Sequence, residues 1–493
     1  MRSGDLVELA GELPPSPLVN ADLAPTGLGQ RTWNMWHIAS LWVGMSVCIP
    51  TYMLAASMIG AGLTWWQSLV AILLGNVIVL VPLLINAHAG TRYGIPFPVY
   101  ARASFGTRGA HIPSLLRSVV ACGWFGIQTW IGGLAIDAIL GILWPGWREL
   151  GGGWRLMGHG LPQYLSFLLF WAINLYFVWA GTESIKWMET LSAPFLIVTG
   201  LALLGWAAVK VGGFGAIFAQ AEVLPGAAGS RSFLSVFVPW VTAMVGYWAT
   251  LSLNIPDFTR YARSQRDQVL GQALGLLTTM PLFAFIGVAV TSATVLLYGQ
   301  AIWNPVDLLT RLTAESGNAL LGLVAMLTLV VATLTTNIAA NIVAPANSLS
   351  NLLPRRITFR TGGLIAAVVG ILIVPWKLLD AYQTWLISYS GLLGAVGGVI
   401  ICDYIVIRRG LLALRDLYTE GGAYAYTRGV NRRAVAALTA GILVALAGTV
   451  VPPLRFLFDG AWFSAAAVAF VVYWWLMKRT YFHEARTPSL EPP

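Results

Sequence analysis

Long runs without Asp, Glu, Lys or Arg constrain the fold of this chain more than any other feature. The first run covers residues 32–91, and ten more follow between residues 118 and 477. A helix that crosses a membrane needs about 20 consecutive, mostly apolar residues. The first run is long enough for two such helices joined near residues 60–62, so the runs together predict 12 spans.

The composition of the 493-residue chain excludes a soluble globular protein. Hydrophobic residues make up 57% of the chain, charged residues make up only 10%, and the mean hydropathy is +0.73. Soluble proteins carry about 25% charged residues, and a chain with far fewer has too little polar surface to face water. The predicted class is therefore an all-α polytopic membrane protein.

The predicted spans divide the chain into five parts. These are a cytoplasmic N-terminal tail (1–32), spans 1–5 (33–210), spans 6–10 (211–406), spans 11 and 12 with a preceding loop (407–480) and a cytoplasmic C-terminal tail (481–493). The expected borders of the spans are 34–57, 64–88, 112–142, 163–182, 187–209, 233–256, 269–298, 317–345, 361–377, 379–405, 434–452 and 459–477.

The distribution of Lys and Arg predicts the orientation of the spans. With the N-terminus inside, 22 of the 29 Lys and Arg residues lie in inner segments and 7 lie in outer ones. Cytoplasmic loops of membrane proteins carry such an excess of cations. We therefore expect a multi-pass protein of the inner or plasma membrane with both termini in the cytoplasm. These loops also account for the net charge of +9, so no nucleic-acid partner is expected.

No signal peptide, disulfide framework or metal cluster is expected. Residues 1–31 carry four acidic residues and four prolines, without the apolar segment of a signal peptide. Cys48, Cys122 and Cys402 lie in apolar runs and match no metal spacing, so they are interpreted as small packing residues. We expect no cofactor, and no obligate protein partner is evident.

Spans 1 and 6 contain Gly and Pro at positions that can interrupt a helix. Span 1 has Gly44 and Pro50, and span 6 has Gly246 and Pro256. Proline leaves a carbonyl without its helical partner, and irregular backbone at membrane depth is tolerated only where protein or a water-lined cavity satisfies it. Interrupted segments at matching positions of two halves point to the binding site of a transporter. The alternative for span 1 is a simple proline kink.

Spans 3 and 8 carry polar and aromatic side chains within apolar helices. Trp124 and Gln128 in span 3 are four residues apart and share a face, as do Asn337 and Asn341 in span 8. The alternative for span 8 is that its amides only join helices by hydrogen bonds. Asp137, near the outer end of span 3, is the one acidic residue that lies more than two residues inside an expected span border.

Aromatic faces and neutral amides at membrane depth suit a planar, uncharged ligand that carries amide groups. Stacking would hold the faces of such a ligand, while Gln and Asn side chains would pair with its donors and acceptors. The sequence contains no catalytic motif, so an intramembrane enzyme is not expected. A channel or a receptor that does not transport remains an alternative, which saturable, gradient-driven accumulation would exclude.

Several motifs resemble those of the nucleobase:cation symporter-1 family. They are WFGIQTW at 124–130, NIPDFTRY at 254–261, TNIAAN at 336–341, GIPF at 94–97, SFG at 104–106 and DY at 403–404. The resemblance covers roughly residues 30–480. It implies a leucine-transporter-like fold, with a 5+5 inverted repeat (spans 1–5 and 6–10) and two extra helices.

The resemblance also implies a set of site residues. A substrate ring would lie between Trp124 and Trp248, and Gln128 and Asn341 would bind its amide edge. A sodium site between spans 1 and 8 would consist of the carbonyls of Gly44, Val47 and Ala332 and the hydroxyls of Thr335 and Thr336.

At two pocket positions the residue differs from that of the family members that transport aryl-substituted hydantoins. Cys48 stands where those members have an amide side chain, and Tyr247 stands where they have glycine. Tyr247 would narrow the space for a bulky substituent, so we expect a small substrate such as uracil or allantoin.

The expected function is a secondary active symporter. It would import a neutral nucleobase or a related amide heterocycle or ureide, of the uracil, allantoin or hydantoin class, with Na⁺ or H⁺ by alternating access. The hydroxyl pair of Thr335 and Thr336 favours Na⁺. The alternative is a proton-coupled permease of the same family for cytosine, purines or a small vitamin.

Overall fold

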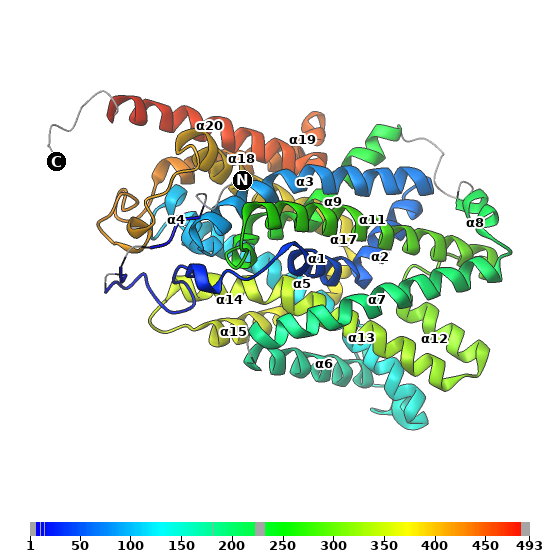
Figure 1. Ribbon diagram of the computed structural model, residues 1–493. Coiled ribbons are helices and arrows are strands. Elements are labelled where there is room, and N and C mark those ends of the chain that lie inside the picture. The colour runs from blue at the N-terminus through cyan, green and yellow to red at the C-terminus, as the bar shows by residue number, and fades with distance from the viewer. Residues whose placement is uncertain (1–5, 10, 14, 181, 222–231, 485–493) are drawn as a thin grey trace.

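The computed structural model describes residues 6–484 except for residues 10, 14, 181 and 222–231. The described chain is largely helical (Figure 1). Its α-helices are α1 (Met35–Ser46), α2 (Ile49–Gly60), α3 (Trp65–Tyr93), α4 (Phe97–Phe105), α5 (His111–Leu143), α6 (Leu161–Ala180), α7 (Thr182–Lys210), α8 (Phe214–Ala221), α9 (Phe233–Asn254), α10 (Pro256–Thr259), α11 (Gln265–Tyr298), α12 (Pro305–Ser316), α13 (Ala319–Asn341), α14 (Val343–Leu352), α15 (Phe359–Leu372), α16 (Pro375–Asp380), α17 (Tyr382–Ile401), α18 (Arg432–Val450), α19 (Arg455–Asp459) and α20 (Ala461–Glu484).

Short elements complete the described structure. Strands β1 (Arg155–Leu156) and β2 (His159–Gly160) form a small antiparallel hairpin between α5 and α6. The turns of tighter or wider helix are Leu28–Gln30, Pro145–Glu149, Cys402–Ile407, Arg415–Tyr418 and Pro452–Leu454.

The helices follow the spans expected from the sequence, although the number of spans stays a prediction. Among the described residues, nine helices are long and apolar enough to cross a membrane, and the bent pair of α1 and α2 makes ten. Two shorter apolar segments, Ile197–Lys210 and Phe359–Leu372, coincide with predicted spans 5 and 9. The last helix continues to Glu484, and residues 485–493 of the expected C-terminal tail lie outside the described residues.

Span 1 is broken in the middle, as its Gly and Pro residues predict. Helix α1 ends at Ser46 and α2 begins at Ile49, with an angle of 57° between the two helices. Cys48 has an extended backbone between them, and Pro50 occupies the first turn of α2, where its missing N–H costs nothing. The break leaves the last carbonyls of α1 without helical partners.

Span 6 does not have the interruption expected at Gly246. Helix α9 runs through Gly246 without a break and ends at Asn254, immediately before the short helix α10 that Pro256 begins. A hydrogen at Cα lets Gly246 sit against α17, because a β-carbon at this position would lie 2.8 Å from the carbonyl oxygen of Leu386. The glycine therefore serves helix packing, and the proline marks the end of the span.

Close packing at glycines also joins α17 to the last helix. A β-carbon on Gly394 would lie 2.6 Å from the carbonyl oxygen of Trp462, and one on Gly398 would lie 2.3 Å from that of Ala466. Small residues four apart allow two helix backbones to approach closely. In Figure 1, α18 and α20 accordingly lie along one edge of the bundle, and α6 and α15 lie along the opposite edge.

The two ends of the bundle differ in charge. We call the end that carries α4 and α10 the basic end, and the end that carries α8 and α12 the distal end (Figure 1). The described part of the N-terminal segment lies against the basic end rather than extending away from it. Arg31, which is buried, donates hydrogen bonds to the carbonyls of Thr26 and Thr91, and Arg260 donates to those of Asp22 and Ala24.

Candidate functional site

The break between α1 and α2 faces a polar stretch of α13. The Thr336 hydroxyl donates to the carbonyl oxygen of Gly44 across the helix junction, at 2.8 Å, and lies 3.0 Å from that of Ala332. Thr335 also donates to the Ala332 carbonyl at 3.0 Å, and Val47 packs against Ala332. The structure therefore brings the five residues expected to hold sodium together at one junction.

The chemistry of this junction fits a small hard cation. Its polar atoms are backbone carbonyls and threonine hydroxyls, which are the oxygen donors typical of cation sites at unwound helices. The hydroxyl of Thr336 already bridges α1 and α13 through the Gly44 carbonyl. A cation that binds these oxygens would replace this hydrogen bond and hold the same two helices together.

A small buried pocket lies directly beside the cation junction. It has a volume of about 20 Å³, which is room for a single water molecule. Helices α1, α5, α9 and α13 contribute its walls, which consist of Met45, Trp124, Gln128, Tyr247, Trp248, Thr250, Leu251, Thr336, Ala340 and Asn341. Five of the six residues expected to bind substrate line this pocket, and Thr336 of the cation junction lines it as well.

Cys48 is the expected substrate residue that does not line the pocket. Its sulfur lies 3.1 Å from the Tyr247 hydroxyl, and the Thr51 hydroxyl lies 3.0 Å from the same oxygen. Cys48 is thus one step removed from the pocket and holds the position of Tyr247.

Hydrogen bonds at their indole nitrogens fix both tryptophans of the pocket. Trp124 donates to the Tyr389 hydroxyl at 3.0 Å, and that hydroxyl in turn donates to the carbonyl of Gly246. Trp248 donates to the Asn76 side chain at 3.1 Å. Because each N–H is satisfied by a neighbouring helix, each indole is held by its edge.

The ring of Tyr247 contacts both tryptophans. Its centroid lies 5.1 Å from that of Trp124 and 4.8 Å from that of Trp248, with both pairs in edge-on geometry. The sequence predicts that Tyr247 narrows the pocket, and this arrangement agrees with the small volume. A planar ring can lie between the tryptophans only if the Tyr247 side chain moves.

The amides of the pocket divide into one that is satisfied and one that is not. Gln128 is 2% exposed, and its side-chain oxygen has no hydrogen-bond partner among the described residues. A buried acceptor without a donor is costly, and a ligand N–H would supply the missing bond. The Asn341 amide donates to Asn337 at 3.0 Å.

Asn337 has the structural role that was weighed as the alternative for span 8. Its amide nitrogen donates to the Thr129 hydroxyl on α5 at 3.0 Å and to the side-chain oxygen of Asn174 on α6 at 3.1 Å. Asn337 therefore joins three helices, and Asn341 alone of the pair lines the pocket. Asp137 also has a structural role, because its carboxylate accepts a hydrogen bond from the Trp147 indole.

Sequence reasoning missed several residues that shape the site. Asn76 and Tyr389 orient the two tryptophans from α3 and α17, helices to which no role in the pocket was assigned. Each is a polar residue within an apolar span, which is the signal that could have identified it. Many other polar residues in the spans do not face the pocket, so this signal alone is not selective.

A second group that was missed lies toward the basic end. Arg117, Asn254 and Asp257 are all buried, and each has side-chain atoms without hydrogen-bond partners among the described residues. Buried polar atoms of this kind are usually bridged by ordered water. The group lies where α10 contacts α4 and α14 and where α5 packs against α14.

Comparisons with known proteins identify the family. A family model described as "permease for cytosine/purines, uracil, thiamine, allantoin" matches residues 25–476. A purine-uracil permease of Arabidopsis thaliana is 44% identical over 94% of this chain and 78% of its own length. An allantoin permease of Bacillus subtilis is 42% identical over 94% of this chain and 93% of its own length.

Solved structures agree with this assignment. The nucleobase-cation-symport-1 transporter Mhp1, closed with bromovinylhydantoin bound, superposes with a TM-score of 0.77 at 28% identity, covering 94% of this chain and 96% of Mhp1. A Na⁺-coupled sialic acid symporter with a TM-score of 0.61 and 15% identity shares the fold alone. The fold is thus the leucine-transporter-like one, and the chain belongs to the family of permeases for cytosine and purines, uracil, thiamine and allantoin.

Proposed function

We propose that this protein is a secondary active symporter for a small, neutral amide heterocycle or ureide of the uracil, allantoin or hydantoin class. The relatives named as purine-uracil and allantoin permeases support this substrate class. The carrying observation is that Thr336 lines the pocket of Trp124, Gln128 and Trp248 and also hydrogen-bonds across the α1–α2 break.

The shared threonine supplies a physical link between ion and substrate. A cation at the junction would fix the end of α1 and the side chain of Thr336, and Met45 at that end lines the pocket together with Thr336. A substrate that contacts this wall would then bind more tightly when the cation is present, and the cation would gain the same free energy from the substrate.

Sodium is the coupling ion that the donor set favours. The residues that line the pocket include no Asp, Glu or His among the described residues, so no group there titrates near neutral pH. Carbonyls and hydroxyls instead suit Na⁺. We assign the ligands to the carbonyls of Gly44, Val47 and Ala332 and the hydroxyls of Thr335 and Thr336.

The geometry of the pocket supports the substrate-binding roles that the family resemblance implies. Gln128 would accept an N–H of the ligand, Asn341 would contact its amide edge, and the indoles of Trp124 and Trp248 would cover its faces. Tyr247, held by Cys48, would limit the substituents that the ring carries. Alternating access would rock α1, α3, α9 and α11 against α5, α6, α13 and α15.

Localisation is proposed from the charges of the loops. The 22 cations counted on the inner side support a cytoplasmic location for the basic end, the N-terminal segment and the C-terminus, with the chain in the inner or plasma membrane.

Uptake into proteoliposomes tests the function. Labelled uracil, allantoin and hydantoin are offered with an inward Na⁺ gradient, with a proton gradient, or with neither. We expect saturable accumulation of one of them that requires Na⁺. Accumulation driven by the proton gradient alone would reject sodium coupling, and accumulation unaffected by collapse of both gradients would reject symport.

A variant of the pocket amide tests the site. We expect Gln128→Ala to weaken substrate binding about tenfold, because a buried hydrogen bond contributes roughly 1–2 kcal/mol. Gln163→Ala is the matched control, since Gln163 only accepts a hydrogen bond from the backbone of Gly160. Substrate affinity is measured by protection against thermal unfolding. Equal affinity in the two variants would remove Gln128 from the site.

A further inference from the structure

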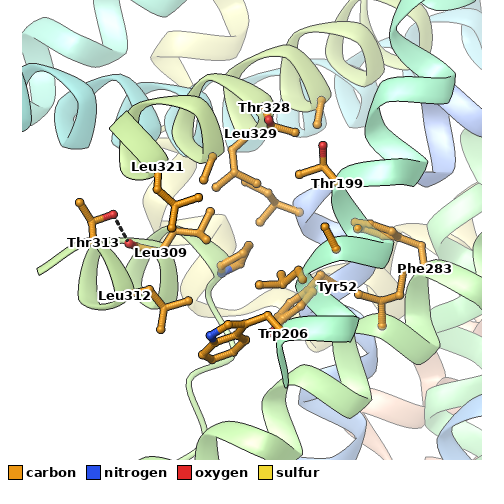
Figure 2. A pocket seen from close by; sticks show the side chains of 18 of the residues that line it. Tyr52, Thr199, Trp206, Phe283, Leu309, Leu312, Thr313, Leu321, Thr328 and Leu329 are labelled. Atoms are coloured by element: carbon orange, nitrogen blue, oxygen red, sulfur yellow. Dashed lines mark hydrogen bonds between the residues drawn. The ribbon is translucent and has the colours of Figure 1, made fainter. Parts of the chain in front are cut away.

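A second, larger cavity lies apart from the proposed substrate pocket. It has a volume of about 490 Å³ and lies between α7, α11, α12 and α13, as Figure 2 shows. Its inner end is formed by Val47, Cys48 and Ala332, at the break between α1 and α2. None of the described residues that line it belongs to α5, α9 or α17, so it is separate from the pocket between the tryptophans. We call it the lateral cavity.

The wall of the lateral cavity is almost entirely apolar. Tyr52, Trp206, Phe283, Leu309 and Leu329 surround it in Figure 2. Two of its threonine hydroxyls form hydrogen bonds within their own helices. Thr313 donates to the Leu309 carbonyl, and Thr328 donates to that of Val324. Such a wall offers little to a hydrated ion or an amide heterocycle. It suits a hydrocarbon, because apolar cavities of this size bind apolar groups.

The outer end of the lateral cavity is charged. Lys210 of α7 and Glu315 of α12 line it there. Glu315 is already bound, because Arg311 and Tyr298 hold its carboxylate at 2.9 and 2.8 Å. Hydrogen bonds from Arg311 and Tyr298 lower the pKa of Glu315, so it stays ionised. Lys210 and Glu315 are the charged residues among those described in the lining, and Arg311 already pairs with Glu315. Lys210 is therefore the cation that an anionic head group could meet.

The cavity is also close to the surface that faces lipid. Leu321 lines the cavity and is 56% exposed, and Leu201 on the adjacent face of α7 is 44% exposed. Both residues belong to apolar segments of membrane-spanning character. A ligand with a long apolar tail can therefore enter from the bilayer.

We propose that the lateral cavity binds a single-chain amphiphile with an anionic head, namely a long-chain fatty acid. The tail lies along Trp206, Phe283 and Leu329 and points toward the α1–α2 break. The carboxylate lies beside Lys210 at the distal end. The apolar wall selects the chain, and the ammonium group of Lys210 selects the head.

The position of the tail has a consequence for transport that rests on the proposed function. The inner end of the cavity is made of residues assigned to the sodium site, Val47 and Ala332. A tail packed against them changes the space available to the α1–α2 break, so fatty acid and Na⁺ alter each other's affinity by the same factor.

Photolabelling tests the binding site without any need for transport. The full-length protein in zwitterionic nanodiscs is labelled with palmitate carrying a diazirine near the end of its tail, and adducts are mapped by mass spectrometry. We expect adducts on Trp206, Phe283 or Leu329 that unlabelled palmitate suppresses. Adducts spread over the lipid-facing residues, without competition, would overturn the proposal.

Paired variants identify the cavity and the head group. Leu203→Trp fills the cavity and should reduce labelling about tenfold, whereas Leu201→Trp, on the lipid-facing side of the same helix, should leave it unchanged. Lys210→Gln should abolish the preference for palmitate over methyl palmitate, and Lys210→Arg should retain it. Equal labelling of the two Trp variants would contradict the assignment of the site.

Competitors distinguish the source of the ligand. Suppression of labelling by palmitate supports the free fatty acid, and suppression only by lysophosphatidylglycerol would overturn it. Labelling that responds to Na⁺ supports the coupling to the α1–α2 break, and unaltered labelling rejects it. Labelling does not depend on a substrate, so a failure of the fatty-acid proposal does not affect the uptake result. A failure of the proposed symport likewise does not affect the labelling result.

Discussion

At the scale of single residues, the site is built from groups that are held by partners outside it. The indole nitrogens of Trp124 and Trp248 bind Tyr389 and Asn76, and the Tyr247 hydroxyl lies beside Cys48 and Thr51. Among the described residues that line the pocket, Gln128 has a fully buried side-chain oxygen without a partner. Specificity should therefore depend on few atoms, and single substitutions should separate their roles.

Tyr247 should control the size of substituent that the pocket accepts. Removal of its ring in Tyr247→Ala opens the space between the two tryptophans, so we expect aryl-substituted hydantoins to compete for uptake. Tyr247→Phe keeps the ring and loses only the hydroxyl, and it should still exclude them. The measurement is competition against the labelled substrate. If aryl-substituted hydantoins competed equally well in Tyr247→Phe and Tyr247→Ala, the hydroxyl and not the ring would set the limit on substituent size.

Thr336 should control the affinity for the cation. In Thr336→Ala the hydroxyl that reaches the Gly44 carbonyl is lost, and we expect the Na⁺ concentration for half-maximal binding to rise about tenfold. Thr336→Ser keeps the hydroxyl and should remain near the original value. Thr333→Ala is the control, because Thr333 bonds only to the Leu329 carbonyl of its own helix. A similar Na⁺ response in the Thr333 and Thr336 alanine variants would argue against the site.

At the scale of helices, backbone contacts decide which glycines matter. The sequence predicts breaks at the glycines of spans 1 and 6, but only span 1 is broken, at Val47 and Cys48. Gly246 lies within an intact helix and permits its contact with α17. A glycine within a span can serve either helix packing or helix unwinding, because both require the missing side chain. Which role applies is known only once the neighbouring helix is known.

Two neighbouring glycines of α17 test this argument. A β-carbon on Gly398 would lie 2.3 Å from the Ala466 carbonyl oxygen, whereas one on Gly397 would meet Leu253 at 3.8 Å, an ordinary contact. We expect Gly398→Ala to cost roughly 1–3 kcal/mol of stability through overpacking, and Gly397→Ala to cost little. Thermal unfolding in detergent measures both. Equal stability of the two variants would show that α20 shifts freely away from α17.

At the scale of the whole molecule, buried polar contacts at the basic end hold distant parts of the chain together. Asp403, after α17, is 1% exposed and accepts hydrogen bonds from Ser104 of the α4 region and Tyr473 of α20, and it pairs with Arg408 at 2.8 Å. The described N-terminal segment is tied to the same end by Arg31 and Arg260. Apart from the Asp403–Arg408 pair and the Arg31–Thr26 hydrogen bond, these contacts are long-range in sequence, so the spans alone do not indicate them.

Loss of Asp403 should destabilise the protein far more than loss of an exposed acid. Asp403→Ala leaves Arg408 buried without its counter-charge, which costs roughly 3–5 kcal/mol. Asp459→Ala breaks the exposed pair with Arg455 and should cost less than about 1 kcal/mol. The comparison is made by thermal unfolding of the purified variants. If Asp403→Ala and Asp459→Ala lost the same stability, water would replace the Asp403 carboxylate at no cost in free energy.

The sequence by itself determined the membrane class, the order of the helices and the broken first span, and its family motifs indicated five of the residues that line the small pocket. These follow from uncharged runs, from proline geometry and from short motifs, all of which act locally along the chain. Only the tertiary structure decided which of the polar residues face the pocket, that Asn337 joins helices while Asn341 lines the cavity, and that Cys48 stands behind Tyr247. It alone also showed the lateral cavity. The physical reason is that a side chain's partner on another helix depends on how that helix is rotated and placed, and nothing in its own segment specifies this.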